Sequence, residues 1–250
     1  MIVGIIPARY ASSRLPGKPL IDLNGQTMIE RVWRAATAST AIDRVIIATD
    51  NEHIVAEAQR LRAEVVLTSP DEPSGTDRCY AALRSLRIEP EIVVNIQGDE
   101  PLLEPGILTH LVEALRSSGS DVATPVRTIT QVGDLSDPSI VKVAMASDAR
   151  ALYFSRSPIP YRRDAAQAQW LDGASYWHHI GIYAYTYAAL KRHVLLPPSP
   201  LERLEQLEQL RLLEDGARFV CVPTDHRFVG VDTPADVERV RAILAQSAQS

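Results

Sequence analysis

Short apolar runs alternate with amphipathic segments through the first half of the chain. The runs are rich in valine and isoleucine and lie at residues 1–6, 44–49, 63–68, 91–97 and 121–126. They are apolar throughout rather than at every second position, which is typical of strands buried on both faces of a sheet. Segments with helical spacing lie between them, at residues 26–38, 51–62, 76–87 and 105–117. This alternation predicts an α/β fold, with a mostly parallel sheet between two layers of helices.

The regular alternation ends near residue 137. Apolar runs at residues 139–145, 151–155 and 178–185 predict strands that no long helix separates, and residues 157–169 resemble a surface loop. We therefore expect a smaller β-rich insert at about residues 137–190, inside a single domain that covers residues 1–250.

The remaining chain returns to helices and a strand. The pattern predicts a charged helix over residues 199–215 and a strand over residues 218–223. A last helix is expected from Thr233, which has the features of an N-cap: Pro234 takes the first helical position and Asp236 lies three residues after the cap.

Composition narrows the classes of function. The chain has 250 residues, 46% of them hydrophobic and 23% charged, which suits a globular protein with a sizeable core. Its net charge of −5 gives no general attraction to nucleic acid or to an anionic membrane. Cys79 and Cys221 lack metal-ligand spacing, and no segment resembles a signal peptide or a membrane span. We therefore expect a cytoplasmic protein with no nucleic-acid or membrane partner.

The loop after the first expected strand is unusually basic. Residues 9–19, RYASSRLPGKP, contain Arg9, Arg14 and Lys18, and ligands of parallel sheets bind beyond the carboxyl ends of the strands. Neither a Walker loop nor a dinucleotide fingerprint is present, which argues against an NAD-dependent oxidoreductase. Gly17 would let the backbone approach an anion, and arginine grips phosphate oxygens in a fork. The loop therefore indicates a nucleotide triphosphate site, although charge alone fits a solvated basic turn equally well.

Two aspartates stand where a cation could bind. Asp99 follows a very apolar strand, and Asp232 precedes the last expected helix. Mg²⁺ in proteins takes one or two carboxylates together with waters and phosphate oxygens. Either aspartate, considered alone, also fits a turn or a helix cap. Ser74 and Asp77 likewise fit a capping box at the start of a helix.

Other polar residues have ordinary structural explanations when each is considered alone. A histidine on a strand, such as His179, is usually a satisfied core residue. The neighbouring pair Glu208 and Gln209 on a helix is usually part of a solvated face.

A resemblance to a known family covers nearly the whole chain. The segments IIPARYASSRLPGKPL, SGTDR, NIQGDEP, ALYFSRSPIP, HHIGIYAY, SPLERLEQLEQLR and GVDTPADVERV, in this order, closely resemble the 3-deoxy-manno-octulosonate (Kdo) cytidylyltransferases, also called CMP-Kdo synthetases. The resemblance implies transfer of CMP from CTP to the anomeric hydroxyl of Kdo with Mg²⁺ and release of pyrophosphate, which activates Kdo for lipopolysaccharide synthesis. It also implies the three-layer nucleotide-diphospho-sugar transferase fold and a homodimer, with the insert serving sugar binding and dimerisation.

The resemblance also implies roles for individual residues. The triphosphate would be held by Arg9, Arg14 and Lys18, which together with Asp99 would be the catalytic residues, and Mg²⁺ would be bound by Asp99 and Asp232. The cytidine end would be contacted by Ser74, Gly75 and Arg78. The sugar acid would be held by Gln97, Arg156, His179, Tyr183, Glu208 and Gln209, with Arg156 facing its carboxylate. The sequence departs from the family at Glu72, where relatives often carry histidine.

Alternatives remain at this point. The acceptor could be another sugar acid, such as an amino variant of Kdo or an acylneuraminate, because the motifs define the nucleotide chemistry better than the sugar. A non-catalytic sugar-nucleotide-binding or scaffolding protein is a further alternative, and the presence of both Asp99 and Asp232 argues against it.

Overall fold

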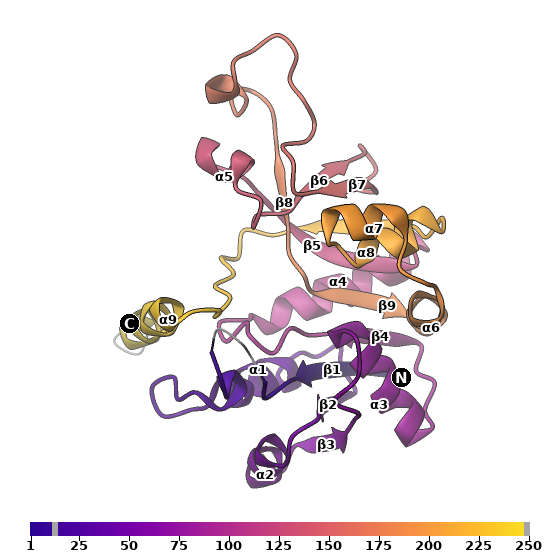
Figure 1. Ribbon diagram of the computed structural model, residues 1–250, viewed down its shortest axis with the longest axis vertical. Helices are drawn as coiled ribbons and strands as arrows, with labels where there is room; N and C mark the ends of the chain where they lie inside the picture. The colour runs from indigo at the N-terminus through magenta and orange to yellow at the C-terminus, as the bar shows by residue number, and fades with distance from the viewer. Residues whose placement is uncertain (12–14, 248–250) are drawn as a thin grey trace. The chain divides into compact units, whose positions relative to one another are not determined.

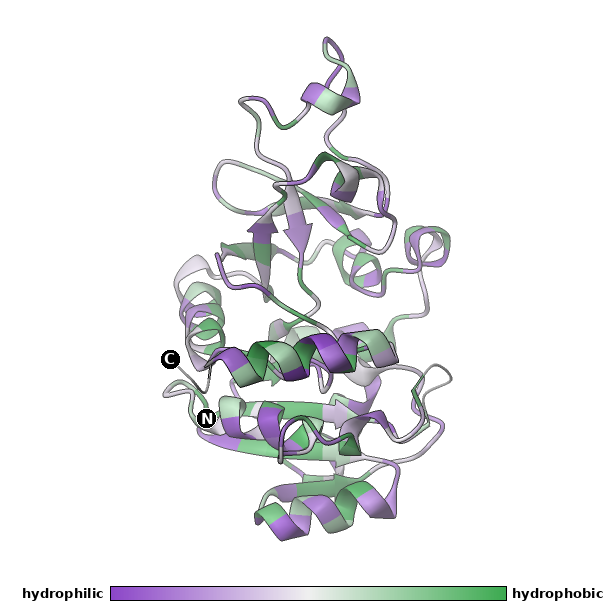
Figure 2. Cartoon of the chain, turned by 90° about the vertical axis from the view of Figure 1, so that its left-hand side faces the viewer, coloured by the Kyte–Doolittle hydropathy of each residue, from purple (hydrophilic) through white to green (hydrophobic). Residues whose placement is uncertain are grey.

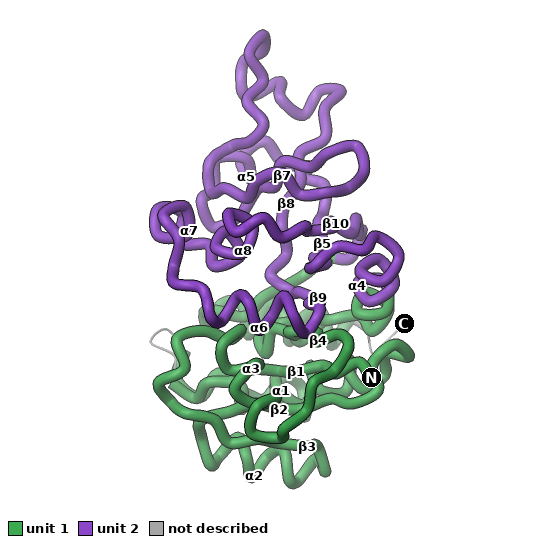
Figure 3. Tube along the Cα trace, turned by 90° about the vertical axis from the view of Figure 1, so that its right-hand side faces the viewer, with its two compact units in different colours: residues 1–109, 227–250 green, residues 110–226 purple. Residues whose placement is uncertain are grey.

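The computed structural model describes residues 1–11 and 15–247 and divides the chain into two compact units. The first unit contains residues 1–109 and 227–250, and the second contains residues 110–226 (Figure 3). The chain therefore leaves the first unit, builds the second, and returns to the first. Within the described residues, no helix combines the length and the apolar character that a membrane span requires.

The first unit is built on four parallel strands. They lie in the order β3-β2-β1-β4 (Figure 1). Their bounds are β1 Ile2–Ala8, β2 Arg44–Thr49, β3 Glu64–Leu67 and β4 Ile92–Asn95. In the register, Gly4 of the central strand pairs with Val45 on one side and Val94 on the other. These strands are largely hydrophobic in Figure 2, in agreement with a sheet buried on both faces. The parallel α/β arrangement predicted for this part of the chain is confirmed.

The helices of the first unit begin at side-chain caps. Thr27 accepts a hydrogen bond from the Glu30 amide, Asn51 from His53, and Ser74 from two amides of the next turn. The bounds are α1 Met28–Thr37, α2 Glu52–Leu61, α3 Gly75–Leu86 and α9 Pro234–Ser247, with a short 3-10 helix η1 at Lys18–Leu20. Helix α4, Pro105–Ser118, runs from the first unit into the second. The predicted helices of this part of the chain are thus present within a few residues of their expected bounds.

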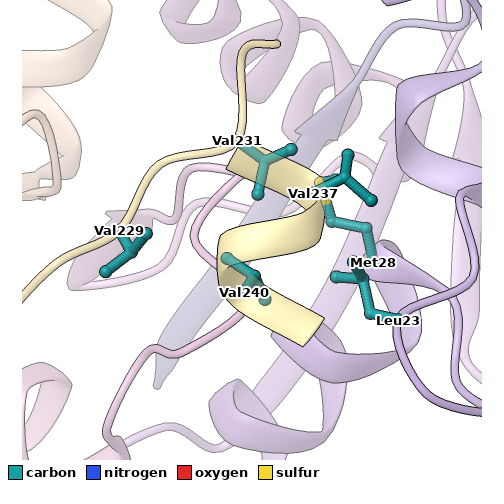
Figure 4. Close-up of a cluster of buried hydrophobic side chains, with 6 residues drawn as sticks. All are labelled: Leu23, Met28, Val229, Val231, Val237 and Val240. Carbon is teal, nitrogen blue, oxygen red and sulfur yellow. The ribbon is translucent and has the colours of Figure 1, made fainter. Parts of the chain in front are cut away.

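The C-terminal segment is held in the first unit by a hydrophobic cluster. The cluster consists of Leu23, Met28, Val229, Val231, Val237 and Val240, all of them buried (Figure 4). The predicted capping of α9 is confirmed, because Thr233 and Asp236 exchange hydrogen bonds in both directions. Packing of α9 against the α1 region fixes the position of the segment that carries Asp232.

The second unit is a mainly antiparallel β structure. Strand β5 pairs in parallel with β10 and antiparallel with β8 and β9, and β6 pairs antiparallel with β7 and β8. The bounds are β5 Val122–Thr128, β6 Lys142–Met145, β7 Ala151–Ser155, β8 Trp177–His179, β9 Tyr183–Thr186 and β10 Phe219–Pro223. The helices are α5 Val132–Ser136, η2 Gln167–Gln169, α6 Tyr187–Leu195, α7 Pro200–Glu205 and α8 Gln209–Glu214. The predicted β-rich character of this region agrees with the structure, while the description of the chain as one domain stays a prediction.

Two predictions for the second unit are wrong in detail. The single helix expected over residues 199–215 is two helices, because Gln206 adopts a left-handed conformation with φ of 53° and ends α7. The single strand expected over residues 178–185 is two strands. The Thr124 hydroxyl lies 3.0 Å from the carbonyl oxygen of Ile180 and 2.9 Å from that of Ile182, so side-chain contacts replace the strand ladder between them.

Candidate active site

A cleft of about 380 Å³ lies in the first unit, where β1 and β4 end. Parallel strands place their carboxyl ends at one edge, which is the usual ligand site of such sheets. The lining comes from the end of β1, η1, the start of α3 and the loop after β4. The lining residues are Pro7, Ala8, Arg9, Ala11, Lys18, Pro19, Gly75, Arg78, Gln97, Gly98 and Asp99. Six of the residues predicted for the site, from four separate segments, thus meet at one cleft.

The basic loop turns back into the cleft at Gly17. This residue has a φ of +69°, which favours glycine, and its amide donates a hydrogen bond to the Tyr10 carbonyl oxygen at 3.2 Å. Lys18 then begins η1 with Pro19 behind it. The predicted phosphate-binding residue Arg14 lies outside the described residues.

Lys18 joins two carboxylates that are distant in the sequence. Its Nζ atom lies 2.7 Å from Oδ2 of Asp99 and 3.0 Å from Oδ1 of Asp232. Burial lowers the pKa of Lys18, but the two carboxylates, Asp99 above all, outweigh this effect and raise the pKa above its ordinary value. Lys18 is therefore charged at neutral pH. We call Lys18, Asp99 and Asp232 the lysine–carboxylate cluster.

The donor set of this cluster fits a divalent cation. Asp99 and Asp232 point hard oxygen atoms at one position, and the group between them is already a cation. Mg²⁺ is bound by one or two carboxylates when phosphate and water complete its octahedron. In the described part of the chain, His, Cys, Asp and Glu form no metal-binding group of three or more. Magnesium at Asp99 and Asp232 stays a prediction.

A third carboxylate, which the sequence analysis missed, lies beside the cluster. Glu100 accepts a hydrogen bond from the Val229 backbone, and burial, followed by the charge of Asp99, raises its pKa to about 8. A Cβ atom at Gly230 would lie 3.2 Å from Oε1 of Glu100, so glycine permits this close approach. Glu100 therefore ties the loop after β4 to the segment that carries Asp232. The pair Asp-Glu in QGDEP was the only available signal, and it does not reveal which carboxylate is buried.

Arg78 forms part of the cleft wall and is completely buried. Its Nη2 atom lies 2.9 Å from Oδ2 of Asp50, and its Nη1 atom donates to the Thr68 hydroxyl at 2.6 Å. Burial lowers the pKa of Arg78, and Asp50 opposes that effect. These contacts fix the guanidinium, so Arg78 is a rigid donor beside the nucleotide position predicted from the sequence. Arg9 is held nearby by a hydrogen bond to the backbone carbonyl of Glu72.

The start of α3 borders the same cleft. Ser74 accepts hydrogen bonds from the Thr76 and Asp77 amides, each at 3.1 Å, and its hydroxyl donates to Asp77 at 2.6 Å. The predicted capping role is confirmed. A Cβ atom at Gly75 would lie 3.3 Å from Pro7, so glycine lets this helix start approach β1 closely. Nucleotide contacts of Ser74 and Gly75 stay a prediction.

Several predicted sugar-binding residues lie in the second unit, where they are buried. The His179 Nε2 atom lies 3.0 Å from the Thr124 hydroxyl, and burial lowers the pKa of this histidine to about 3. Burial, followed by the charge of Glu208, raises the pKa of Tyr183. Gln209 is only 3% exposed, so the alternative of a solvated helix face is wrong for it. Sugar binding by these residues stays a prediction.

Arg156 connects the end of α7 with the segment around Pro138 in the second unit. Its guanidinium donates to the carbonyl oxygens of Glu205 at 2.7 Å, Pro138 at 2.7 Å and Gln206 at 3.1 Å. These bonds stabilise the left-handed turn at Gln206 that separates α7 from α8. Pairing of Arg156 with a sugar carboxylate stays a prediction.

Comparisons with known proteins identify the family of this chain. Residues 3–219 match the model of a family described as cytidylyltransferase. A 3-deoxy-manno-octulosonate cytidylyltransferase of Syntrophobacter fumaroxidans is 46% identical, covering 99% of this chain and 98% of the relative. A mitochondrial enzyme of the same name from Arabidopsis thaliana is 40% identical, covering 98% of this chain and 83% of the relative.

Solved structures show the same relationship. A structure of CMP:2-keto-3-deoxy-manno-octonic acid synthetase complexed with CTP is 40% identical, covers 98% of this chain and 99% of that chain, and has a TM-score of 0.91. A cytidylyltransferase from Leptospira borgpetersenii is 18% identical with a TM-score of 0.65, covering 98% of this chain and 87% of that chain, and shows the shared fold alone. The expected nucleotidyltransferase fold is confirmed. On this evidence the chain belongs to the 3-deoxy-manno-octulosonate cytidylyltransferase, or CMP-Kdo synthetase, family.

Proposed function

We propose that the protein transfers CMP from CTP to the anomeric hydroxyl of Kdo, releases pyrophosphate, and so activates Kdo for lipopolysaccharide synthesis. The observation that carries the proposal is the lysine–carboxylate cluster near the ends of β1 and β4. In addition, the chain matches nearly the whole length of a relative named 3-deoxy-manno-octulosonate cytidylyltransferase. Charged groups of both signs at one cleft are what a cation-bound triphosphate requires.

The reaction needs no nucleophile from the protein. The acceptor hydroxyl must approach the α-phosphate in line with the leaving pyrophosphate, so the contribution of the protein is orientation and charge neutralisation. Arg9 and Lys18 line the cleft and would neutralise phosphate oxygens, together with Arg14. Arg78, fixed by Asp50 and Thr68, would present a rigid donor toward the cytidine end.

Magnesium belongs to the proposal as the cofactor. Asp99 and Asp232 would hold it, and the bound ion would neutralise phosphate charge and make the acceptor hydroxyl more acidic. We further propose that Gln97, which lines the cleft, and Arg156, His179, Tyr183, Glu208 and Gln209 hold the sugar acid, and that the protein is a cytoplasmic homodimer.

The test is pyrophosphate release from CTP in the presence of Mg²⁺ and Kdo. Release should require Kdo and should be faster with CTP than with ATP or GTP. Equal rates with N-acetylneuraminate or an amino variant of Kdo would contradict the assignment of Kdo as the acceptor. Tight binding of CTP without turnover on any sugar acid would favour a non-catalytic sugar-nucleotide-binding protein. Sedimentation of the purified protein tests the homodimer.

A further inference from the structure

The ammonium of Lys18 lies between the two carboxylates that we expect to bind the divalent cation. We infer that Lys18 is an internal cation that neutralises Asp99 and Asp232 in the free protein and competes with a free divalent cation for them, so that only a cation arriving together with a nucleoside triphosphate displaces it readily. This inference rests on the proposed function.

Electrostatics makes the ammonium and a free divalent ion competitors. Both are attracted to the same carboxylate oxygens, and Lys18 approaches them at 2.7 and 3.0 Å, close enough to occupy the bridging position. A divalent ion entering beside the ammonium would be repelled twice as strongly as a monovalent ion at the same distance. Because Lys18 is largely buried, with 14% of its side chain exposed, solvent screens this repulsion only partly. A free divalent ion must therefore displace Lys18 from the carboxylates, and it brings no negative partner for the displaced ammonium.

The cation–nucleotide complex changes this balance. The phosphate oxygens offer the displaced ammonium a new negative partner inside the same cleft, which Lys18 lines. The cation then takes the carboxylates and the ammonium takes the phosphates, so each charge keeps a partner. Free nucleotide should bind less tightly than the cation–nucleotide complex, because its phosphates are repelled by two carboxylates that a single ammonium neutralises only in part. Cation and nucleotide should therefore strengthen the binding of each other.

The local backbone allows this exchange with the side chain alone. The Lys18 amide donates to the Leu15 carbonyl oxygen at 3.1 Å, and the Lys18 carbonyl oxygen accepts from the Ile21 amide at 3.2 Å. Gly17 on one side is anchored to Tyr10, and Pro19 on the other side is buried within η1. Lysine is a point charge on an unbranched four-carbon stem, so its ammonium can change partners by rotamer rotation while the main chain stays in place.

The experiment measures Mn²⁺ binding by the loss of the free-ion electron paramagnetic resonance signal, in the absence of nucleotide. Lys18→Met removes the charge and keeps the length of the side chain. It should bind Mn²⁺ at least about tenfold more tightly than wild type, since the competing cation is gone. Lys191→Met, the same change at an exposed position of α6, is the matched control and should bind Mn²⁺ as wild type does. Adding Asp99→Asn to Lys18→Met should abolish the gain, which locates the bound ion.

The same titration in the presence of CTP, without any sugar, should give the opposite order. Lys18→Met should then bind the Mn²⁺–CTP complex at least about tenfold more weakly than wild type, because the phosphates lose their ammonium partner. If Lys18→Met fails to fold, as judged by circular dichroism, Lys18→Gln replaces it. Equal or weaker Mn²⁺ binding by the folded variant without nucleotide would overturn the inference.

Failure of the inference and failure of the proposed function are distinguishable. If the wild type releases pyrophosphate in a Kdo-dependent manner and Lys18→Met binds Mn²⁺ as the wild type does, the inference about Lys18 is wrong and the proposed cytidylyltransferase reaction is retained. If Lys18→Met binds Mn²⁺ more tightly than wild type but the wild type turns over no sugar acid, the proposed reaction is wrong and the inference about Lys18 is retained for a nucleotide-binding protein.

Discussion

The amide of Val231 donates a hydrogen bond to the carbonyl oxygen of Asp99 at 3.0 Å. The two predicted metal ligands, Asp99 and Asp232, are thus connected through the backbone as well as through Lys18. This bond depends on the segment before α9, whose valines pack in the hydrophobic cluster of the first unit. Geometry at the site is therefore linked to packing on α9.

Val240→Ala tests that link. Val240 is fully buried in the cluster, and removing two methyl groups should lower the free energy of unfolding by about 2 kcal/mol. We also expect a higher KM for the metal–nucleotide substrate, because the position of Asp232 becomes less restricted. Urea unfolding and steady-state kinetics measure the two effects. Arg239→Ala, at an exposed position of the same helix, is the control. A loss of stability with wild-type KM would show that the cluster supports the fold without positioning Asp232.

Lys18→Ala should lower kcat/KM by on the order of 10²–10³-fold, equivalent to roughly 2.7–4 kcal/mol of transition-state stabilisation. The reason is the loss of the ammonium that neutralises the phosphates. The free protein should also become somewhat less stable at low salt, since Asp99 and Asp232 then repel each other, and added salt should reduce this difference in stability. Kinetics and salt-dependent unfolding provide the measurements. Near-full activity of the folded variant would show that Lys18 pairs with Asp99 and Asp232 for structural reasons and does not neutralise the phosphates.

Asp99→Asn and Asp232→Asn should each cost activity heavily with little change of fold. Asparagine keeps the shape and one acceptor oxygen but removes the charge that a hard cation requires. Because both ligands would act through one ion, the double variant should be far less impaired than the product of the two single losses. The Mg²⁺ dependence of activity in all three variants is the measurement. Multiplicative losses with an unaltered Mg²⁺ midpoint would contradict a shared ion.

His179 should make the protein sensitive to acid. Burial lowers its pKa to about 3, whereas the unfolded chain takes up this proton from about pH 6.5 downward. The unfolded state therefore binds more protons in this window, and the free energy of unfolding falls as the pH drops from about 6.5 toward 3, by up to about 1.4 kcal/mol per pH unit.

His179→Gln should remove this part of the slope, since glutamine can still bond the Thr124 hydroxyl and carries no titrating proton. Urea unfolding at several pH values between 7 and 4 measures the difference. His110→Gln, at an exposed position of α4, serves as the surface control. If the free energy of unfolding depends on pH in the same way for wild type and His179→Gln, the imidazole takes up its proton as readily in the folded state as in the unfolded state.

The sequence predicts the first unit better than the second because local signals there agree with the tertiary structure. Apolar strands, capping residues at Thr27, Ser74 and Thr233, and helical spacing all lead to the same elements. The segment at residues 199–215 fails this test. Helix formers continue through Gln206, and the left-handed turn there is supported by contacts such as the bond from Arg156 to the Gln206 carbonyl oxygen, which the sequence does not reveal.

The site shows the same division. Carboxylates and cations at strand ends identify Lys18, Asp99 and Asp232, because residue type and position relative to a strand are readable from the chain. Burial is not readable in this way. The sequence therefore does not reveal that Glu100, beside Asp99, is buried, or that Asp50 and Thr68 hold the Arg78 guanidinium.

The return of the chain to the first unit has a consequence for protein synthesis. Lys18 and Asp99 leave the ribosome early, whereas Asp232 follows only after the whole second unit has been made. An unfinished chain therefore has Asp99 without Asp232, and so lacks one of the two carboxylates proposed to bind the cation. Fragments that end before Asp232 should therefore bind a metal–nucleotide complex less tightly than the whole chain does.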